Sequence, residues 1–201
     1  MKKSKLAFLA GVTVASALFL ASCGSSSKSS QTNTYSYVFS TDPDSLNYLL
    51  SNRSTTSDVT TNLVDGLFEN DKYGNLVPAL AEDWSVSKDG LTYTYKLRKD
   101  AKWYDSEGNE YADVTAQDFV TSLKYVADNK SDALYLVQNS VAGLDDYVTG
   151  KNTDFSKVGV KAVDDHTLQY TLAQPESFWN SKLTTSTMMP VNEKFLKSAG
   201  K

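Results

Sequence analysis

The segment Leu91–Arg98 alternates apolar with polar side chains, and this alternation constrains the fold more than any other feature of the chain. Apolar side chains at every second position are typical of a strand with one buried and one solvated face. Trp84–Val86 predicts a shorter strand before it, and Ser87–Gly90 predicts the turn between them, because glycine tolerates a positive φ. The side chains expected on the buried face are Leu91, Tyr93, Tyr95 and Leu97.

An amphipathic helix is predicted to follow this hairpin, after the charged loop Asp105–Asp113. Thr115 is a suitable N-cap residue, and Asp118 lies at the third helical position, where a carboxylate faces free backbone amides. The apolar residues of this helix recur three or four positions apart and predict a buried stripe. They are Phe119, Leu123 and Val126. Strands and helices are therefore mixed in one α/β chain.

The remaining elements are predicted from the same patterns. They are a first strand at Tyr35–Phe39, a helix at Ser57–Phe68 with Val59, Leu63 and Leu67 on one face, a helical or loop segment at Asp132–Val141, a hairpin of Val158–Val163 and Thr167–Leu172, and a short helix after Asn192. The hairpin is expected to turn at residues 164–166.

Composition limits the function. With 201 residues, of which 40% are hydrophobic, the chain can form one sizeable core. The formal charge is −4, and removal of a leader containing three lysines makes the mature chain more acidic, which argues against nucleic acid or an anionic surface as a partner. Cys23 is the single cysteine, so neither an intrachain disulfide nor a multi-cysteine metal site is expected.

The first residues have the pattern of a secretory signal peptide. Basic Met1–Lys5 precedes apolar Leu6–Leu20, which is shorter than the roughly 20 residues of a membrane-spanning helix. Leu20–Cys23 resembles the bacterial lipobox, which implies cleavage before Cys23 and attachment of a diacylglyceryl group to its sulfur. Several acyl chains give durable anchoring. Gly24–Thr34 contains no apolar residue and is predicted to be a flexible tether.

No catalytic pattern is evident. The only histidine, His166, falls in a predicted hairpin turn between acidic residues, where an exposed turn residue is the simpler interpretation than a Ser-His-Asp triad. The sequence contains no zinc, calcium, phosphate-loop or dinucleotide motif. We therefore expect a protein that is not an enzyme and that has no cofactor and no metal.

Several blocks, in order and spacing, resemble the extracellular solute-binding proteins of peptide ABC transporters, family 5, the oligopeptide-binding group. They are Asp65–Glu69, Pro78–Trp84, Asp89–Tyr93, Leu97–Trp103, Val114–Val120 and Val158–Leu168. The resemblance implies an α/β fold of the periplasmic-binding-protein type, class II. Its N-terminal lobe I contains an inserted smaller α/β domain.

In this family an extended peptide lies between two lobes and pairs with strand edges through its main chain, while hydrated pockets accept many side chains. Matched residue by residue from Asp65–Leu67, the peptide-facing segment of lobe I falls on Asn52, Arg53 and Ser54.

A family tyrosine contact, carried over without gaps, falls on Asp132, with Tyr135 nearby. Asp132 thus departs from the family pattern. The alternative interpretations are a plain surface loop at residues 52–54 and a core position for Tyr135.

The implied domain boundaries follow the same resemblance. They are a signal peptide at 1–22, the lipidated Cys23 and tether at 23–34, the start of lobe I at 35–56, the inserted smaller domain at 57–156, and a return to lobe I at 157–201. The resemblance covers about the first third of a family member, so we expect the second large lobe to be absent from this sequence. One lobe alone is expected to bind oligopeptides weakly or not at all.

The function implied is that of a substrate-binding lipoprotein of an ABC importer. It would be anchored at Cys23 on the extracellular face of the cell membrane, capture oligopeptides and deliver them to the permease subunits. The alternatives are a truncated surface lipoprotein without transport activity and a related binding protein for another small solute.

Overall fold

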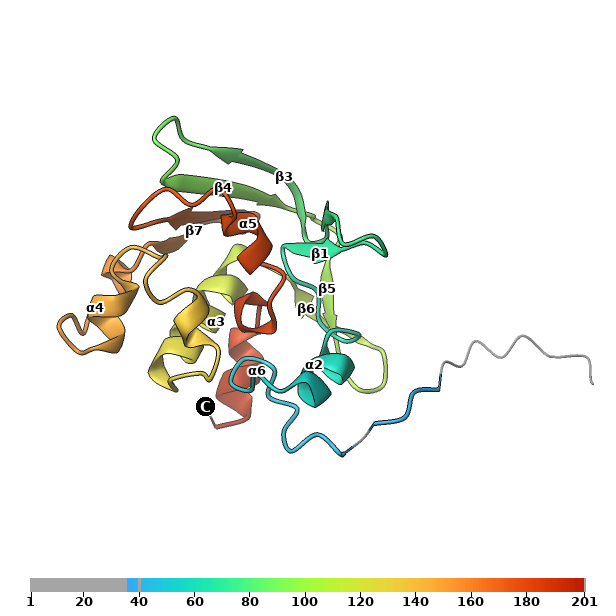
Figure 1. Ribbon diagram of the computed structural model, residues 1–201. Helices are drawn as coiled ribbons and strands as arrows, with labels where there is room; N and C mark the ends of the chain where they lie inside the picture. The colour runs from blue at the N-terminus through green and yellow to red at the C-terminus, as the bar shows by residue number, and fades with distance from the viewer. Residues whose placement is uncertain (1–35, 40, 201) are drawn as a thin grey trace, which may run out of the picture. The chain divides into compact units, whose positions relative to one another are not determined.

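A computed structural model describes residues 36–39 and 41–200 (Figure 1). The chain divides into two compact units, Met1–Val38 and Phe39–Lys201, and every regular element of the described residues belongs to the second unit. The predicted signal peptide, Cys23 and the tether at 24–34 lie outside the described residues. Within the described part, no helix has both the length and the apolar character required to cross a bilayer.

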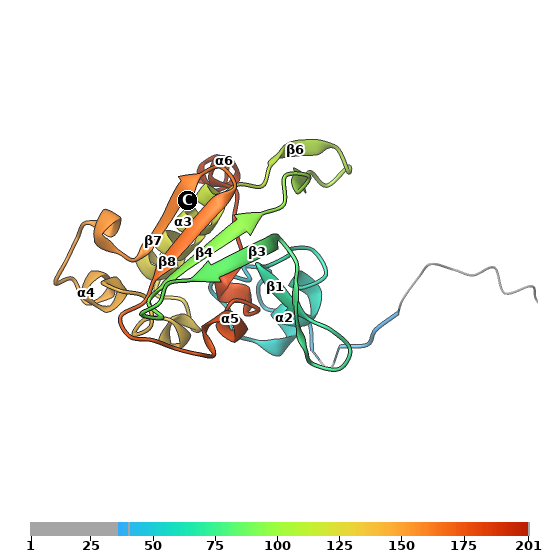
Figure 2. The same ribbon diagram turned by 90° about the horizontal axis from the view of Figure 1, so that it is seen from above.

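Four antiparallel strands form the main sheet of the second unit, in the order β3-β4-β8-β7 (Figure 2). Their bounds are Ala81–Val86 for β3, Thr92–Leu97 for β4, Val160–Asp164 for β7 and Thr167–Thr171 for β8. Both predicted hairpins, β3–β4 and β7–β8, are confirmed, and Gly90 in the first turn has a φ of +72°. The β4 strand is central because it also pairs with β8, with Tyr95 opposite Leu168.

The other elements surround this sheet. Two small hairpins pair β1 (Phe68–Asn70) with β2 (Leu76–Pro78) and β5 (Lys102–Tyr104) with β6 (Glu110–Asp113). The helices are α2 (Ser54–Thr60), α3 (Ala116–Asp128), α4 (Leu144–Val148), α5 (Trp179–Lys182) and α6 (Glu193–Ser198). Short 3-10 turns are η2 (Leu134–Leu136), η3 (Phe155–Lys157) and η4 (Ser186–Met188). Helix α3 packs against β7 and β8 and covers one face of the sheet (Figure 1).

The core lies beneath β4 and is rich in aromatic side chains. Tyr95 is fully buried, and its ring meets the rings of Phe68 and Tyr170 edge-on, with centroid distances of 5.9 and 6.3 Å. Its hydroxyl donates to Asn180 Oδ1 over 2.6 Å, so the one polar atom of this side chain is satisfied. Trp179 in α5 meets Tyr170 at 5.4 Å. The predicted burial of Tyr93, Tyr95 and Leu97 is confirmed.

The two small hairpins turn through the same pattern, Asp-x-x-Gly-Asn, at Asp71–Asn75 and Asp105–Asn109. In each turn one carboxylate oxygen accepts backbone N–H groups two and four residues ahead, and the other accepts the asparagine amide. The glycine φ angles are +82° and +83°, where a Cβ would be strained. The hydrogen bonds from the asparagines hold the pKa of each aspartate below its usual value.

The helix predicted at Ser57–Phe68 is misplaced. Helix α2 ends at Thr60, Leu63 is 72% exposed, and Phe68 begins β1. The buried face of α2 consists of threonines instead of the predicted apolar residues, and the Thr56 hydroxyl donates to Ser45 O over 2.8 Å. The chain then passes close to other backbone at Gly66, where an added Cβ would lie 3.0 Å from Leu183 O. A continuous helix is incompatible with that approach.

Other predicted features also need correction. Residues 36–39 of the predicted strand Tyr35–Phe39 belong to no strand, since the three described sheets are formed by later residues. The predicted loop Asp105–Asp113 is a loop only as far as Asn109, because its turn chemistry directs the following residues back along β5 as β6. Strands β4 and β8 lie on either side of the predicted boundary between residues 156 and 157 and pair in one sheet, and the domain boundaries stay a prediction.

We predict that Tyr95→Ala lowers the free energy of unfolding by about 3–5 kcal/mol, the range for removing a buried aromatic side chain. The exposed Tyr104 offers a matched control, and Tyr104→Ala is expected to change stability by no more than about 0.5 kcal/mol. Urea unfolding followed by circular dichroism measures both. Equal losses in the two variants would contradict the position of Tyr95 in the core.

Asp118 connects three elements and is 4% exposed. Its Oδ2 accepts the indole N–H of Trp103 in β5 over 2.9 Å and the backbone N–H of Thr115 over 3.0 Å, which confirms the predicted start of α3. Its backbone oxygen accepts the N–H of Val191, just before α6. Burial raises the pKa of this carboxyl above its usual value, although the hydrogen bonds act in the opposite direction.

The raised pKa of Asp118 gives a pH dependence of known sign. The folded chain holds the Asp118 proton more tightly than the unfolded chain, so stability falls as the pH rises from 3.8 through the raised value. We therefore expect the unmodified chain to gain stability relative to Asp118→Asn as the pH is lowered from neutral toward 4. Unfolding free energies of both proteins across this range test it. A difference that stays constant or shrinks on acidification would show that the carboxyl is not desolvated.

Candidate functional site

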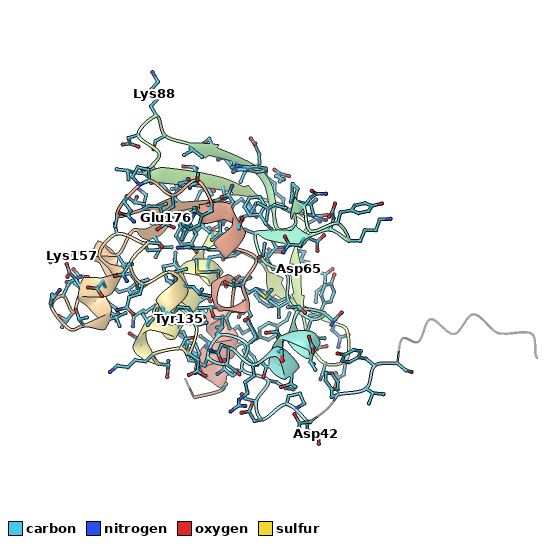
Figure 3. The ribbon with its side chains drawn as sticks, viewed as in Figure 1. Asp42, Asp65, Lys88, Tyr135, Lys157 and Glu176 are labelled. Carbon is cyan, nitrogen blue, oxygen red and sulfur yellow. The ribbon has the colours of Figure 1, made fainter. Side chains whose placement is uncertain are left out.

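Two segments that are far apart in the sequence meet beside α3. The backbone N–H of Asp132 donates to Leu50 O over 3.0 Å, and the Ser131 hydroxyl donates to Leu49 O over 2.6 Å. These bonds bring the predicted residues Asn52–Ser54 into the same region as the predicted Asp132 and Tyr135. All five side chains are exposed, and Figure 3 marks Tyr135 on the segment after α3.

The first segment is held firmly by the residues that precede it. The Asn47 amide donates to the Tyr125 hydroxyl of α3 over 3.0 Å, and the Tyr48 hydroxyl donates to Pro190 O over 2.6 Å. Burial raises the pKa of the Tyr48 hydroxyl above its usual value. Leu49 is 2% exposed and anchors the same stretch in the core. The exposed residues 52–54 therefore follow a fixed support.

The main chain of Asn52 has unused hydrogen-bonding groups. Among the described residues, neither its N–H nor its C=O has a hydrogen-bond partner. The next residue, Arg53, is the N-cap of α2 and has extended backbone angles, φ −75° and ψ 135°. A free backbone donor and acceptor next to an extended residue can pair with another extended chain.

The side chains of the site are placed for contact with solvent or a ligand. The Arg53 Nε lies 2.8 Å from Asp44 Oδ2 in an exposed ion pair. The Tyr135 side chain is 68% exposed, which excludes the alternative interpretation as a core residue. Backbone pairing, one charged pair and one aromatic ring are therefore available together.

Asp44 and Ser131 were not predicted as members of this site. Asp44 lies in an acid–proline turn visible in the sequence, but nothing local indicates that its carboxylate reaches Arg53. Ser131 acts through the Leu49 carbonyl, 82 residues away, and a contact of that separation leaves no local pattern.

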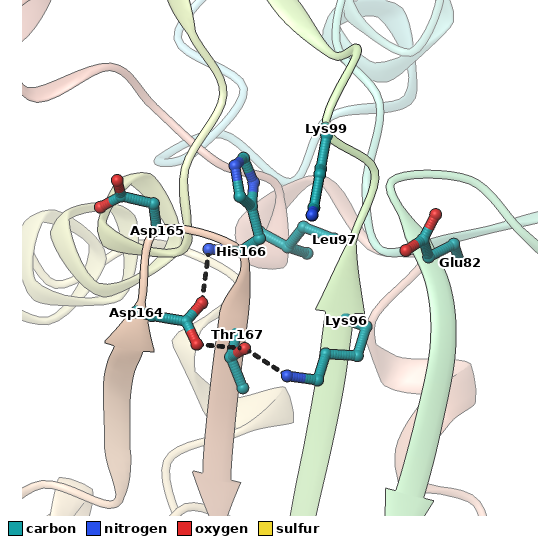
Figure 4. A pocket seen from close by; sticks show the side chains of 8 residues that line it. All are labelled: Glu82, Lys96, Leu97, Lys99, Asp164, Asp165, His166 and Thr167. Atoms are coloured by element: carbon teal, nitrogen blue, oxygen red, sulfur yellow. Dashed lines mark hydrogen bonds between the residues drawn. The ribbon is translucent and has the colours of Figure 1, made fainter.

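His166 lines a separate cavity of about 530 Å³ at one end of the main sheet (Figure 4). The lining residues are Glu82, Lys96, Leu97, Lys99, Asp164, Asp165, His166 and Thr167. The prediction of a hairpin-turn position for His166 is confirmed, but its side chain is half-buried instead of exposed, because the turn closes over the end of β4, where Leu97 N–H donates to the His166 carbonyl.

The groups around this cavity do not form a catalytic triad. Its lining includes no serine or cysteine. The Lys96 ammonium donates to Thr167 Oγ1 over 2.7 Å, and that hydroxyl donates to Asp164 Oδ2 over 2.8 Å (Figure 4). This series of hydrogen bonds connects β4, β8 and β7 at this end of the sheet. In the described part of the chain, no group of three or more His, Cys, Asp or Glu residues is arranged to hold a metal ion.

Solved structures of oligopeptide-binding proteins share this fold. OppA of Listeria monocytogenes, solved bound to peptide, is 34% identical and matches 78% of this chain and 30% of its own, with a TM-score of 0.70. OppA of Haemophilus influenzae, in complex with RPPGFSPFR, is 31% identical over 80% of this chain and 31% of its own, with a TM-score of 0.71. The predicted fold class, α/β of the periplasmic-binding-protein type, is confirmed.

Sequence relatives define the class more narrowly. Oligopeptide-binding protein AliB of Streptococcus pneumoniae is 65% identical over 202 residues, and SarA of Streptococcus gordonii is 62% identical over 207. Each match covers 100% of this chain and 31% of the relative's length. Residues 75–201 match the family described as "Bacterial extracellular solute-binding proteins, family 5 Middle". The chain belongs to this family.

Proposed function

We propose that the chain is part of a lipid-anchored substrate-binding protein that captures oligopeptides outside the cell for an ABC importer. The observation that carries this proposal is the junction between Leu50 and Asp132, which unites the two predicted binding segments. The relatives at above 60% identity are named as oligopeptide-binding proteins, which supports peptides as the ligand class. Permease subunits of the importer are the partners that such a protein would meet.

Main-chain pairing at Asn52 explains how one site could accept many peptides. Every peptide offers the same backbone N–H and C=O groups, so bonds to Asn52 are independent of peptide sequence. The exposed side chains at Arg53, Ser54 and Tyr135 leave room for water around the peptide's side chains. Affinity would then come from the backbone, with side chains adjusting it.

We infer a carrier and not an enzyme. Capture and release of a peptide by hydrogen bonds leave its covalent bonds intact, and this requires no nucleophile. The groups gathered at the candidate site are an arginine, acidic residues, a serine, an asparagine and a tyrosine, without a base positioned on the serine.

We predict that Asn52→Pro weakens peptide binding by about fivefold or more, since proline lacks the N–H and one hydrogen bond is worth roughly 1 kcal/mol. Asn52→Ala is the matched control because it removes the side chain but keeps the backbone donor. Two-dimensional NMR titration with millimolar mixed pentapeptides is suitable, because weak binding is expected. If Asn52→Pro binds as well as Asn52→Ala while keeping the native spectrum, main-chain pairing at this residue is wrong.

Membrane attachment is proposed to depend on Cys23. The support is the small-residue segment Leu20–Cys23 after a short apolar stretch, and the extracellular character of the family. Thioether-linked acyl chains would hold the folded part at the membrane through the tether at 24–34.

We expect Cys23→Ala to move the protein from the membrane to the soluble fraction, because the sulfur that receives the lipid is removed. Cell fractionation and immunoblotting measure this distribution. Ser22→Ala, which keeps a small residue before the cysteine, is the control and should remain membrane-bound. Retention of Cys23→Ala in the membrane fraction would overturn the lipobox interpretation.

A further inference from the structure

The Asp132 carboxylate has no structural task in the turn that contains it. Aspartates usually occupy turns because their side chains accept nearby backbone N–H groups. Here Ser131 fulfils that role, since its Oγ accepts Ala133 N–H over 3.3 Å and its carbonyl accepts Leu134 N–H over 3.0 Å. No hydrogen bond or ion pair to the Asp132 carboxylate is present among the described residues.

Several other exposed aspartates of the chain have partners within their own turn or hairpin. Asp71, Asp105 and Asp154 each accept backbone N–H groups of their own turns. Asp113 pairs with Lys102, next to it across the β5–β6 hairpin. The Asp132 side chain is exposed and, like those of Asp58 and Asp165, has no partner among the described residues, so its charge is available to a ligand.

The position of Asp132 is nevertheless fixed. Its backbone N–H is bound to Leu50 O, two residues before the proposed pairing residue Asn52. Tyr135 lies three residues further along the same turn region, in η2, with its ring exposed. An extended chain that pairs at Asn52 would therefore come near the exposed Asp132 and Tyr135.

Among the described residues, no neighbouring cation forms an ion pair with the Asp132 carboxylate. Arg53 is engaged by Asp44. Lys130 lies two residues before Asp132, but no ion pair joins them among the described residues, and the backbone of Lys130 turns through a positive φ of 50°. Asp58 on α2 adds a further exposed negative charge close in sequence to the site.

We propose that Asp132 and Tyr135 form a subsite for a cationic group of the bound peptide. This inference rests on the proposed function and names a preference within it. A carboxylate attracts an ammonium or guanidinium, and an exposed tyrosine ring adds a cation–π contact. The cation is a lysine or arginine side chain or the peptide's own amino terminus. Main-chain contacts do not distinguish peptides by sequence, whereas this subsite favours peptides with a cationic group at the matching position.

The test uses the full chain and pentapeptides in matched pairs. Nα-acetylated peptides carry a single lysine at each position in turn, and norleucine, its neutral isostere, replaces that lysine in the partner peptide. An unacetylated, lysine-free peptide is compared with its acetylated form, which separates the amino terminus from a side chain. Dissociation constants are measured by NMR titration at 0.05 and 1 M salt.

We expect the charged peptide of one pair to bind about fivefold more tightly than its neutral partner. This factor corresponds to roughly 1 kcal/mol from an exposed charge pair with a ring contact. The preference should fall at 1 M salt, since screening then acts within about 3 Å. Asp132→Asn should abolish the preference, so that the charged and neutral peptides of the pair bind alike. Glu107→Gln, at the exposed tip of the β5–β6 turn, should leave it intact.

Tyr135→Leu should reduce the preference, whereas Tyr73→Leu, at an equally exposed tyrosine of the β1–β2 turn, should not. Peptides that bind without any charge preference, or a preference that survives in Asp132→Asn, would overturn the cationic subsite while leaving peptide binding in place. If no peptide of either charge binds, peptide capture by this part of the protein fails as well. These two failures are therefore distinguishable.

Discussion

The structure depends on the pairing of β4 on both of its edges. Strand β3 bonds to one edge and β8 to the other, so Tyr95 is held between Trp84 and Leu168 in the ladder. The ring of Tyr95 then organises the aromatic core below, including Phe68 at the start of β1. Because β1, α5 and the main sheet all contact this core, the position of β4 determines where they lie. The supports of the candidate site follow from the same packing.

The parts of the fold that were predictable are those with a local cause. Alternation revealed β4, the cap residues Thr115 and Asp118 marked the start of α3, and a glycine turn marked the β3–β4 hairpin. The helix at Ser57–Phe68 was misplaced because its buried face uses threonines, which a search for apolar periodicity ignores. The β4–β8 pairing was not predictable from either strand, since both carry the same alternation and register depends on tertiary contacts.

The residues of the candidate site were named from the sequence, but their assembly was not predictable. Family resemblance named two candidate binding segments, and in the structure these segments meet through Leu50 and Asp132. The sequence could not indicate that Ser131 takes over the turn's hydrogen bonds and leaves the Asp132 carboxylate unused. That distinction depends on which of two adjacent polar residues points into the turn. Neither composition nor spacing contains this information.

The distance along the chain between β4 and β8 affects the order of folding. Thr94 and Gln169 touch across the sheet although 75 residues separate them. The central ladder therefore cannot close until β8 has been synthesised, and such non-local pairing slows folding. Before that moment β4 has one open edge. Late closure of the central ladder therefore leaves the open edge of β4 available to other strands during folding.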